Sequence, residues 1–436
     1  MAELAVELNH PDRRALNDEV HARPPDNLPT PCALAYLARV PAGRKQDRHA
    51  SSSKMLASLL EHYDIPALSS EARNHTASLN GIRLRWEQHT EYSRYSFFDG
   101  SSSASPFSTS ITSTLPDEWL ASMRGELLIG VNAAIASKDV WNDDIDEISQ
   151  RYFDGNVLVG GRVADGCGIA LTDFRIREDG LTRLLLIDIG MTEAQSGRVM
   201  QRLLEIETYR MMALLALPVA QQLMPVLDDD ERELASIGEA LVSAGSQHEP
   251  ELLDRITRLA AASQHRHLRS DYRFAAADAY YDIVLQRISE LRETRIPALQ
   301  TFEEFTTRRL APAVKTYRAV SKRQRAILEQ MARATKLLST RIDIERQRQN
   351  QSLLSSMNRR VKAQLRLQAT VEGLSVAAVT YYVVGLVGTL AKSVTAFGIE
   401  LDKDIVAGVS IPIIAAGAYF GIRRLRQGID VEGAEP

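Results

Sequence analysis

Two apolar segments close to the C-terminus constrain this chain more than any other feature. They cover Leu374–Leu390 and Ile405–Ile422, and neither contains a charged residue. Each has about 18 residues, which at a rise of about 1.5 Å per residue is just enough for a helix to cross the hydrocarbon core of a bilayer. The sequence therefore predicts a transmembrane hairpin over residues 374–422, and the lipid bilayer is the first partner that we expect.

Basic residues flank both apolar segments on the same side of this hairpin. Four precede the first segment and three follow the second: Arg359, Arg360, Lys362, Arg366, Arg423, Arg424 and Arg426. Because cytoplasmic loops carry an excess of Lys and Arg, both flanks are expected in the cytoplasm and the connector 391–404 on the opposite side. We therefore expect a multi-pass membrane protein with both termini in the cytoplasm.

Composition argues against several other classes of protein. The formal net charge is −4, so no global field favours a nucleic-acid partner. Cys32 and Cys167 are the two cysteines, which argues against a disulfide scaffold and suits a reducing compartment. The opening residues 1–10 have neither the basic nor the apolar region of a cleaved signal peptide.

The region before Met191 reads as an α/β domain. Apolar residues alternate with arginines over 82–86, which is typical of a half-buried strand, and Tyr92–Phe98 is expected to pair with it. A helix is expected at Lys54–Tyr63. Further strands are expected at Leu127–Ile135, Asn156–Val163, Gly168–Arg177 and Leu181–Ile189. We assign residues 51–191 to an α/β domain with antiparallel strands, and residues 1–50 to an irregular, proline-rich N-terminal arm.

The region after Met191 reads as helical. Thr192 is a good N-cap, and Gln195 three residues later completes a capping box. The acidic run Asp228–Glu231 is expected to open a further helix, because negative charge complements the helix dipole. Four prolines separate several helices in a helical domain over residues 192–312: Pro218, Pro225, Pro297 and Pro312.

Residues 313–373 are predicted to form one stalk helix, because no Pro or Gly interrupts them before Gly373. Two apolar sets recur there at heptad-like spacing: Val320, Ile327, Met331, Ala334 and Leu338, then Leu354, Met357, Val361 and Leu365. The stalk is therefore expected to pack on partner helices. The alternative is two antiparallel helices joined by a turn near Asn350. A cytoplasmic tail, 423–436, follows the hairpin.

The N-terminal block His10–Pro25 is dense in polar groups. Asp18, Glu19 and His21 are the candidates for an acid, base or metal constellation, but their spacing fits no known metal motif. Prolines around a short charged helix more often fix an arm that docks across a domain. The glycine-rich stretch 160–168 precedes a strand rather than a helix, so it is read as a turn and not as a phosphate site. We expect no cofactor and no enzyme activity.

Small and acidic residues mark the hairpin. Gly385 and Gly388 in the first segment, with Gly417 and Gly421 in the second, would allow close helix packing within one chain or between copies. The connector carries three carboxylates that would attract cations if repeated around a ring, although in one copy they form a solvated turn: Glu400, Asp402 and Asp404.

Two blocks carry a resemblance to a known family. Leu16–Pro25 (LNDEVHARPP) and Tyr381–Leu386 (YYVVGL) resemble the domain-of-unknown-function 3422 family of bacterial membrane-anchored proteins. The likeness covers the whole chain and brings no activity, cofactor or catalytic residue with it. The family-motif residues in the first block are Asn17, Asp18, Glu19, His21 and Arg23.

A more distant likeness concerns architecture alone. An α+β cytoplasmic domain, long helices, a stalk and two C-terminal spans are similar to the layout of CorA-type magnesium channels, which implies a CorA-like homo-oligomer. Those channels place a Gly-Met-Asn motif at the outer end of the first span. Here Thr389–Thr395 contains no such motif, and Lys392 would oppose cation entry.

These observations lead to three functional hypotheses. The first is an integral inner-membrane protein that acts as a CorA-like, homo-oligomeric ion channel or transporter without the Gly-x-Asn signature. The alternative is a membrane-anchored scaffold or assembly protein that binds a cytoplasmic protein partner and transports nothing. An enzyme, resting on Asp18, Glu19 and His21, is the weakest of the three.

Overall fold

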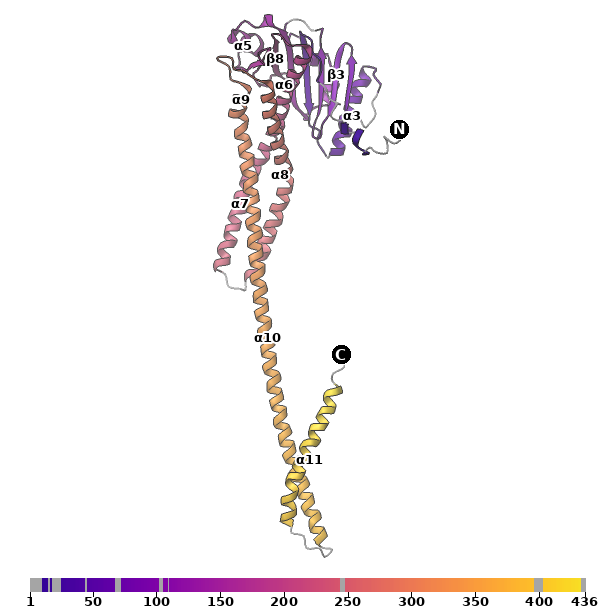
Figure 1. Ribbon diagram of the computed structural model, residues 1–436, viewed down its shortest axis with the longest axis vertical. Coiled ribbons are helices and arrows are strands. Elements are labelled where there is room, and N and C mark those ends of the chain that lie inside the picture. The colour runs from indigo at the N-terminus through magenta and orange to yellow at the C-terminus, as the bar shows by residue number, and fades with distance from the viewer. Residues whose placement is uncertain are drawn as a thin grey trace. The chain divides into compact units, whose positions relative to one another are not determined.

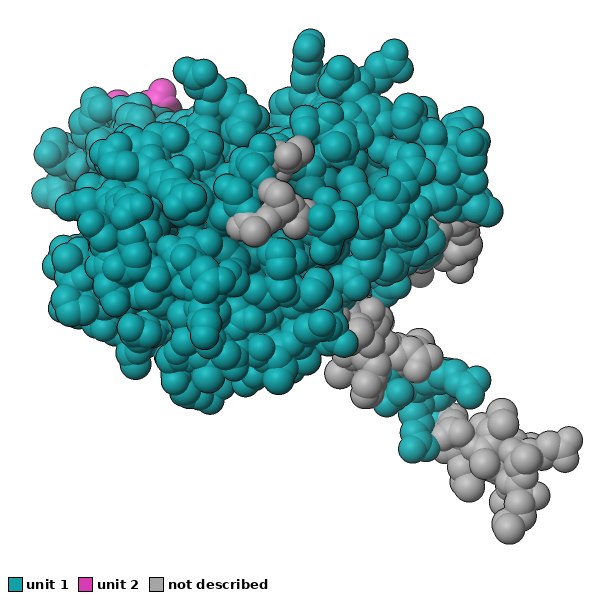
Figure 2. Space-filling view, turned by 90° about the horizontal axis from the view of Figure 1, so that it is seen from above, with its two compact units in different colours: residues 1–243, 254–335 teal, residues 244–253, 336–436 magenta. Residues whose placement is uncertain are grey.

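The computed structural model describes residues 10–14, 16–17, 25–43, 45–66, 72–101, 105–108, 110–243, 248–395 and 403–432. The chain divides into two compact units. Unit 1 comprises residues 1–243 and 254–335, and unit 2 comprises residues 244–253 and 336–436 (Figure 2, teal and magenta). Two helices, α8 (Glu249–Leu291) and α10 (Ala311–Thr395), contribute residues to both units.

Unit 1 contains a mixed sheet with the strand order β2-β3-β4-β1-β5-β8-β7-β6 (Figure 1). Neighbouring strands are antiparallel except β5 and β8, which are parallel. The strands are β1 (Cys32–Arg39), β2 (Asn74–Leu79), β3 (Ile82–Gln88), β4 (Ser93–Asp99), β5 (Leu127–Ser137), β6 (Val159–Val163), β7 (Gly168–Thr172) and β8 (Thr182–Asp188).

Helices cover both faces of the sheet, so the central strands are apolar on both sides. In β1, Leu34 and Tyr36 point into one core while Ala35 and Leu37 point into another, as the period of two in a strand requires. The second face packs against α3 (Lys45–His62), η1 (Ile111–Thr114), α4 (Asp117–Ala121) and α5 (Ile145–Phe153). A short helical turn, η2 (Lys138–Val140), follows β5.

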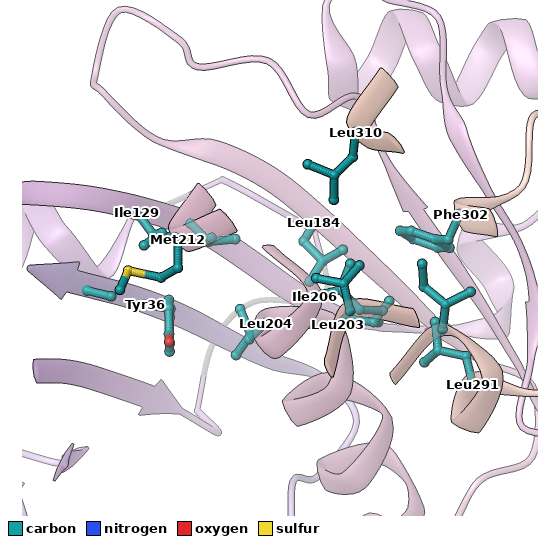
Figure 3. Packing of buried hydrophobic residues seen from close by; sticks show 14 of the residues in the cluster. Tyr36, Ile129, Leu184, Leu203, Leu204, Ile206, Met212, Leu291, Phe302 and Leu310 are labelled. Atoms are coloured by element: carbon teal, nitrogen blue, oxygen red, sulfur yellow. The ribbon is translucent and has the colours of Figure 1, made fainter. Parts of the chain in front are cut away.

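The first face packs against α6 (Glu193–Leu214). Leu203, Leu204 and Ile206 of this helix lie beside Leu184 of β8, and Phe302 and Leu310 belong to the same cluster (Figure 3). Thr192 and Gln195 form the predicted capping box at its N-terminus, in which Gln195 N–H donates to Thr192 Oγ1 at 3.3 Å. The sequence therefore located the start of this helix correctly.

In unit 1, α7, α8 and the first part of α10 run side by side as a bundle (Figure 1). Val320, Ile327 and Met331 are buried on α10, which confirms the first heptad-like set as a packing face. The helices after α6 are α7 (Ala216–Ser243), α8 (Glu249–Leu291), α9 (Phe302–Phe305), the π-helical turn η4 (Thr306–Leu310) and α10 (Ala311–Thr395). In unit 2, α11 (Lys403–Glu432) follows.

Several expectations need correction. The acidic run Asp228–Glu231 lies in the middle of α7 and does not open a helix, because its carboxylates pair across the bundle instead of facing a helix N-terminus. Pro225 lies inside α7 without ending it. α10 is unbroken at Asn350, so the two-helix alternative for the stalk is wrong.

The sheet agrees with the sequence in part. β3 and β4 form the predicted antiparallel pair. The stretch 160–168 contains the end of β6, a turn at 164–167 and the first residue of β7, so the predicted strand-to-strand turn is confirmed. Strand β1, however, lies inside the range that we assigned to the irregular arm, and it occupies the centre of the sheet between β4 and β5. The structure thus has the predicted α/β domain followed by long helices.

Candidate functional site

The two apolar segments are exposed helices in unit 2. The first lies in the C-terminal part of α10 and the second in α11. Many of their large side chains are exposed, by fractions from 44% for Val379 to 79% for Tyr381, and the others are partly exposed. Soluble proteins rarely expose so much contiguous apolar surface, so these helices need lipid or another protein around them.

Three helical stretches are long and apolar enough to cross a membrane, within Glu193–Ser243, Phe302–Ser393 and Ile405–Ile422. The first of them belongs to α6 and α7. There Met212, Ala216 and Ala220 are completely buried in the main core of unit 1. In this stretch 28% of the most apolar window is buried, against 6% and 0% in the other two. We therefore assign it to unit 1 and keep the two C-terminal segments as candidate spans.

An apolar groove with a volume of about 810 Å³ lies between α10 and α11. Its α10 wall runs from Gly373 to Thr389, and Ile411 and Ala415 come from α11. The Thr380 hydroxyl donates to the Val376 carbonyl oxygen at 2.7 Å, and Thr389 bonds in the same way to Gly385 at 2.8 Å. Among the described residues that line this groove none is charged, so the groove suits an acyl chain or an apolar helix better than an ion.

The four predicted packing glycines have open surroundings in the single chain. A Cβ added to Gly385, Gly388, Gly417 or Gly421 would meet no atom within 4 Å. Packing of these residues within one chain is therefore absent from the described helices. Packing between copies stays a prediction.

The acidic connector is only partly described. Glu400 and Asp402 lie outside the described residues, and Asp404 falls in the first turn of α11. The family-motif residues Asp18, Glu19, His21 and Arg23 likewise lie outside the described part of the chain, while Asn17 is an exposed residue in a helical turn.

The chain that follows this motif docks tightly on α6. The Leu28 N–H donates to the Glu193 carbonyl oxygen at 3.1 Å, and the Leu28 side chain is buried. Gly197 lies under the backbone of Asp26, where a Cβ would be 1.6 Å from the carbonyl oxygen. These contacts belong to residues just after the block His10–Pro25, and the docking of the block itself stays a prediction.

A cluster of arginines and carboxylates anchors the same segment to the sheet. Asp26 Oδ2 accepts a hydrogen bond from Arg85 Nη1 at 2.8 Å, and Asp26 Oδ1 lies 3.5 Å from Arg83 Nη2. Arg85 also contacts Glu87, with 2.7 Å between Nη2 and Oε1. Arg94 of β4 donates to the other oxygen of Glu87. A chain of ion pairs therefore connects the docked segment to buried residues of β3 and β4.

Glu87 is fully buried and keeps its charge through these partners. Burial alone would raise the pKa of its carboxyl. Hydrogen bonds from His89 and Arg94, with the charges of Arg94 and Arg85, outweigh burial and hold the pKa well below its usual range. A buried carboxylate of this kind is strongly destabilising when it loses a partner.

A small cavity opens beside this cluster, with a volume of about 30 Å³. Asp26, Tyr36, Arg85, Arg94 and Ser96 supply its polar lining. The volume is enough for one or two water molecules but not for a cofactor. We therefore interpret the cluster as the structural anchor of the N-terminal segment.

Sequence reasoning did not find this anchor. The alternation over 82–86 placed Arg83 and Arg85 on one face of a strand, which was the available signal. The partners Asp26, Glu87 and Arg94 come from three separate segments, and a single sequence does not show that they meet.

A second buried carboxylate ties α8 to the β3–β4 turn. Glu91 is 4% exposed, accepts a hydrogen bond from Tyr280 Oη at 2.6 Å and also pairs with Arg273. Burial and the nearby Glu91 carboxylate raise the pKa of Tyr280. This contact connects the sheet to the bundle.

The described residues contain no candidate metal site. No group of three or more His, Cys, Asp or Glu side chains there is arranged to hold a metal ion. His265 and His267 do not share a site: His265 is exposed, while His267 Nδ1 lies 3.3 Å from Gln324 Oε1.

Comparison with known proteins supports the resemblance found in the sequence. No curated protein matches the chain significantly. A family model described as "Protein of unknown function (DUF3422)" matches residues 8–429. That range includes the N-terminal block, the sheet, the bundle and both apolar segments. The chain therefore belongs to the DUF3422 family.

Proposed function

We propose that this protein is an integral protein of the bacterial inner membrane that holds its α/β domain and helical bundle in the cytoplasm. Leu374–Leu390 of α10 and Ile405–Ile422 of α11 would cross the bilayer as a hairpin. One observation carries the proposal. A single unbroken helix, α10, has buried residues in unit 1 and carries the charge-free apolar segment Leu374–Leu390, many of whose side chains are exposed, near its C-terminal end.

Energetics favour lipid around these helices. Moving one Leu-sized side chain from water to apolar surroundings is worth roughly 1.5–3 kcal/mol. The exposed side chains of both segments together would therefore outweigh the 5–15 kcal/mol or so that separates folded from unfolded proteins. Leaving them in water would favour aggregation over a soluble monomer.

Within this proposal, a membrane-anchored scaffold or assembly protein has the better support. The groove between α10 and α11 has no charged lining residue among those described, the Thr380 and Thr389 hydroxyls are engaged by their own helix, and its other side-chain hydroxyls are those of Tyr381 and Tyr382. The selective part of an ion path is typically built from backbone carbonyls or charged side chains. A scaffold needs only an anchored domain that can bind a cytoplasmic protein.

The second candidate is a CorA-like, homo-oligomeric ion channel or transporter. It is favoured by the open surroundings of Gly385, Gly388, Gly417 and Gly421, since small residues would let helices of neighbouring copies approach closely. The acidic connector would then face the entrance of the pore.

Fractionation of the full chain tests the anchor. We expect the protein in the membrane pellet after an alkaline wash, with release by detergent alone. The double variant Leu386→Arg, Ile413→Arg should lose stable membrane association, because a charge at the centre of a span is costly. Val242→Arg is the matched control, since Val242 is 90% exposed on α7. Recovery of the unmodified protein in the soluble fraction without detergent would disprove the proposal.

Measurements of the oligomeric mass and of ion flux distinguish the channel from the scaffold. A strictly monomeric mass in detergent would exclude the channel, because two helices cannot enclose a pore. If the protein is oligomeric, ion flux into vesicles is compared with that of the triple variant Glu400→Gln, Asp402→Asn, Asp404→Asn. A flux that falls in the variant would favour the channel, and the absence of flux in both would favour the scaffold.

A further inference from the structure

One stretch of α10 is charged with a single sign. Between Glu345 and Glu372 the sequence has no acidic residue, and its basic residues are Arg346, Arg348, Arg359, Arg360, Lys362 and Arg366. All of them lie in unit 2 on the same continuous helix, just before the first apolar segment. Such a segment attracts anions and repels a second copy of itself.

Three of these residues share one face of the helix. Arg359, Lys362 and Arg366 follow the spacing i, i+3, i+7, which places their side chains on the same side. All three are exposed. Arg359 Nη2 lies 3.4 Å from Ser356 Oγ, and no carboxylate in the described ranges pairs with any of the three. We call these three residues the basic face.

The opposite side of the same turns is apolar. Met357, Val361 and Leu365 are 62%, 52% and 50% exposed, and at about 100° per residue they point away from the basic face. The segment is therefore an amphipathic basic helix. A cluster of basic residues directly before a membrane span is typical of segments that attract anionic lipids.

The position along the helix brings this side of α10 toward the membrane surface. Arg366, Lys362 and Arg359 precede Leu374 by about 12, 18 and 22 Å along the helix axis. The headgroup layer extends roughly 5–8 Å beyond the hydrocarbon core, so the long Arg366 side chain reaches it directly, while Lys362 and Arg359 are drawn to its negative surface potential at longer range. The α11 segment after Ile422 adds Arg423, Arg424 and Arg426, and the sequence has no acidic residue from Ile405 to Ile429.

We propose that the basic face binds the phosphate headgroups of anionic phospholipids at the cytoplasmic surface of the membrane. This inference rests on the proposed membrane insertion and adds the class of lipid that the protein recognises. Neighbouring copies of this chain would meet through the opposite, apolar side of the helix and would leave the basic face without a negative partner. A lipid headgroup supplies the missing negative charge and lies where the helix enters the bilayer.

Retention of lipid by the full chain tests this proposal. The detergent-purified protein is reconstituted into nanodiscs of phosphatidylcholine mixed with phosphatidylglycerol, re-extracted, and its bound lipid is quantified by mass spectrometry. We expect several-fold enrichment of phosphatidylglycerol, and weaker enrichment at high salt because salt screens exposed charges. Arg359→Gln, Lys362→Gln, Arg366→Gln should abolish the enrichment.

The matched control is Arg308→Gln, Arg309→Gln, which changes exposed arginines of η4 in unit 1 and should keep the enrichment. Equal enrichment in the wild type and the triple variant would overturn the lipid proposal. So would complete displacement of the lipid by inorganic phosphate, which would indicate a free-phosphate site. Failure of the wild type to enter nanodiscs of any composition would instead contradict membrane insertion itself.

Discussion

Gly197 of α6 and Asp26 of the docked N-terminal segment are in direct backbone contact, and a Cβ on Gly197 would lie 1.6 Å from the Asp26 carbonyl oxygen. Gly197→Ala must therefore displace Asp26 and weaken its ion pairs with Arg83 and Arg85. We expect a loss of about 2–4 kcal/mol in the free energy of unfolding, in the range of overpacked or disrupted cores. Tryptophan fluorescence during urea unfolding measures it, because Trp86, Trp119 and Trp141 all belong to unit 1.

Gly238→Ala provides the control for this change. Gly238 also lies in a helix, but a Cβ there would meet nothing within 4 Å. Alanine favours an exposed helix over glycine by up to about 1 kcal/mol. The control should therefore be neutral or slightly stabilising. Equal effects of the two substitutions would show that the contact with Asp26 is unimportant.

Glu87 should make unit 1 sensitive to acid. Its pKa in the folded protein is held below the unfolded value of about 4.5, so its contribution to stability is present above that value and is lost as pH falls below it. Glu87→Gln should cost about 3–5 kcal/mol at neutral pH, because Arg94 and Arg85 lose a buried partner. Urea unfolding at a series of pH values measures both effects, with the exposed Glu61→Gln as control. An unchanged acid dependence in Glu87→Gln would contradict this account.

The contribution of Glu293 to the stability of unit 1 should depend on pH in the opposite direction. Its carboxylate oxygens each accept from the Phe302 N–H at 3.0 Å, at the N-terminus of α9. Burial raises its pKa from 4.5 to about 7. The folded state therefore binds a proton that the unfolded state releases, so this contribution to stability is full below about 4.5 and is lost as pH rises through about 7.

The variant Glu293→Gln tests whether stability falls as pH rises for this reason. The variant should lose the decline in unfolding midpoint between these two pH values, while the exposed Glu118→Gln should keep it. Thermal melts followed by circular dichroism are sufficient. A variant whose pH profile matches that of the wild type would show that Glu293 titrates at its ordinary pKa.

Within the acidic run Asp228–Glu231 of α7, we expect the carboxylate of Asp230 to contribute most to folding stability. Asp230 is 5% exposed and accepts from Arg266 Nη2 at 2.6 Å, whereas the side chain of Asp229 is 67% exposed. Asp230→Ala should cost about 3 kcal/mol because it leaves the Arg266 guanidinium without its buried partner. Asp229→Ala should change stability by less than about 0.5 kcal/mol. Similar values for the two variants in urea unfolding would refute the assignment.

The sequence predicted features that depend on local pattern. The capping box at Thr192 and Gln195 lies within one turn of chain, and the β3–β4 pair has a clear period of two. β1 was missed because Cys32–Arg39 is buried on both faces, so its apolar residues do not alternate with polar ones. Prolines directly before it favoured the reading of an irregular arm.

Charged residues were harder to place because their partners are distant in sequence. Asp230 complements Arg266 on another helix, and a helix N-terminus was the nearest local explanation for the acidic run. Arg94 and Glu87 likewise meet only after β3 and β4 pair. Local rules describe charges near helix ends well, but they do not show which charges a tertiary fold brings together.

The central place of β1 affects how the chain tolerates trimming. A deletion that extends past Arg39 would remove β1, which is a central strand and not an edge strand. The sheet would then be divided into β2-β3-β4 and β5-β8-β7-β6, with no strand to join the two parts. Each half would then expose a bare row of amide and carbonyl groups, which invites pairing between molecules. Truncated proteins that lack the first forty or so residues should therefore aggregate.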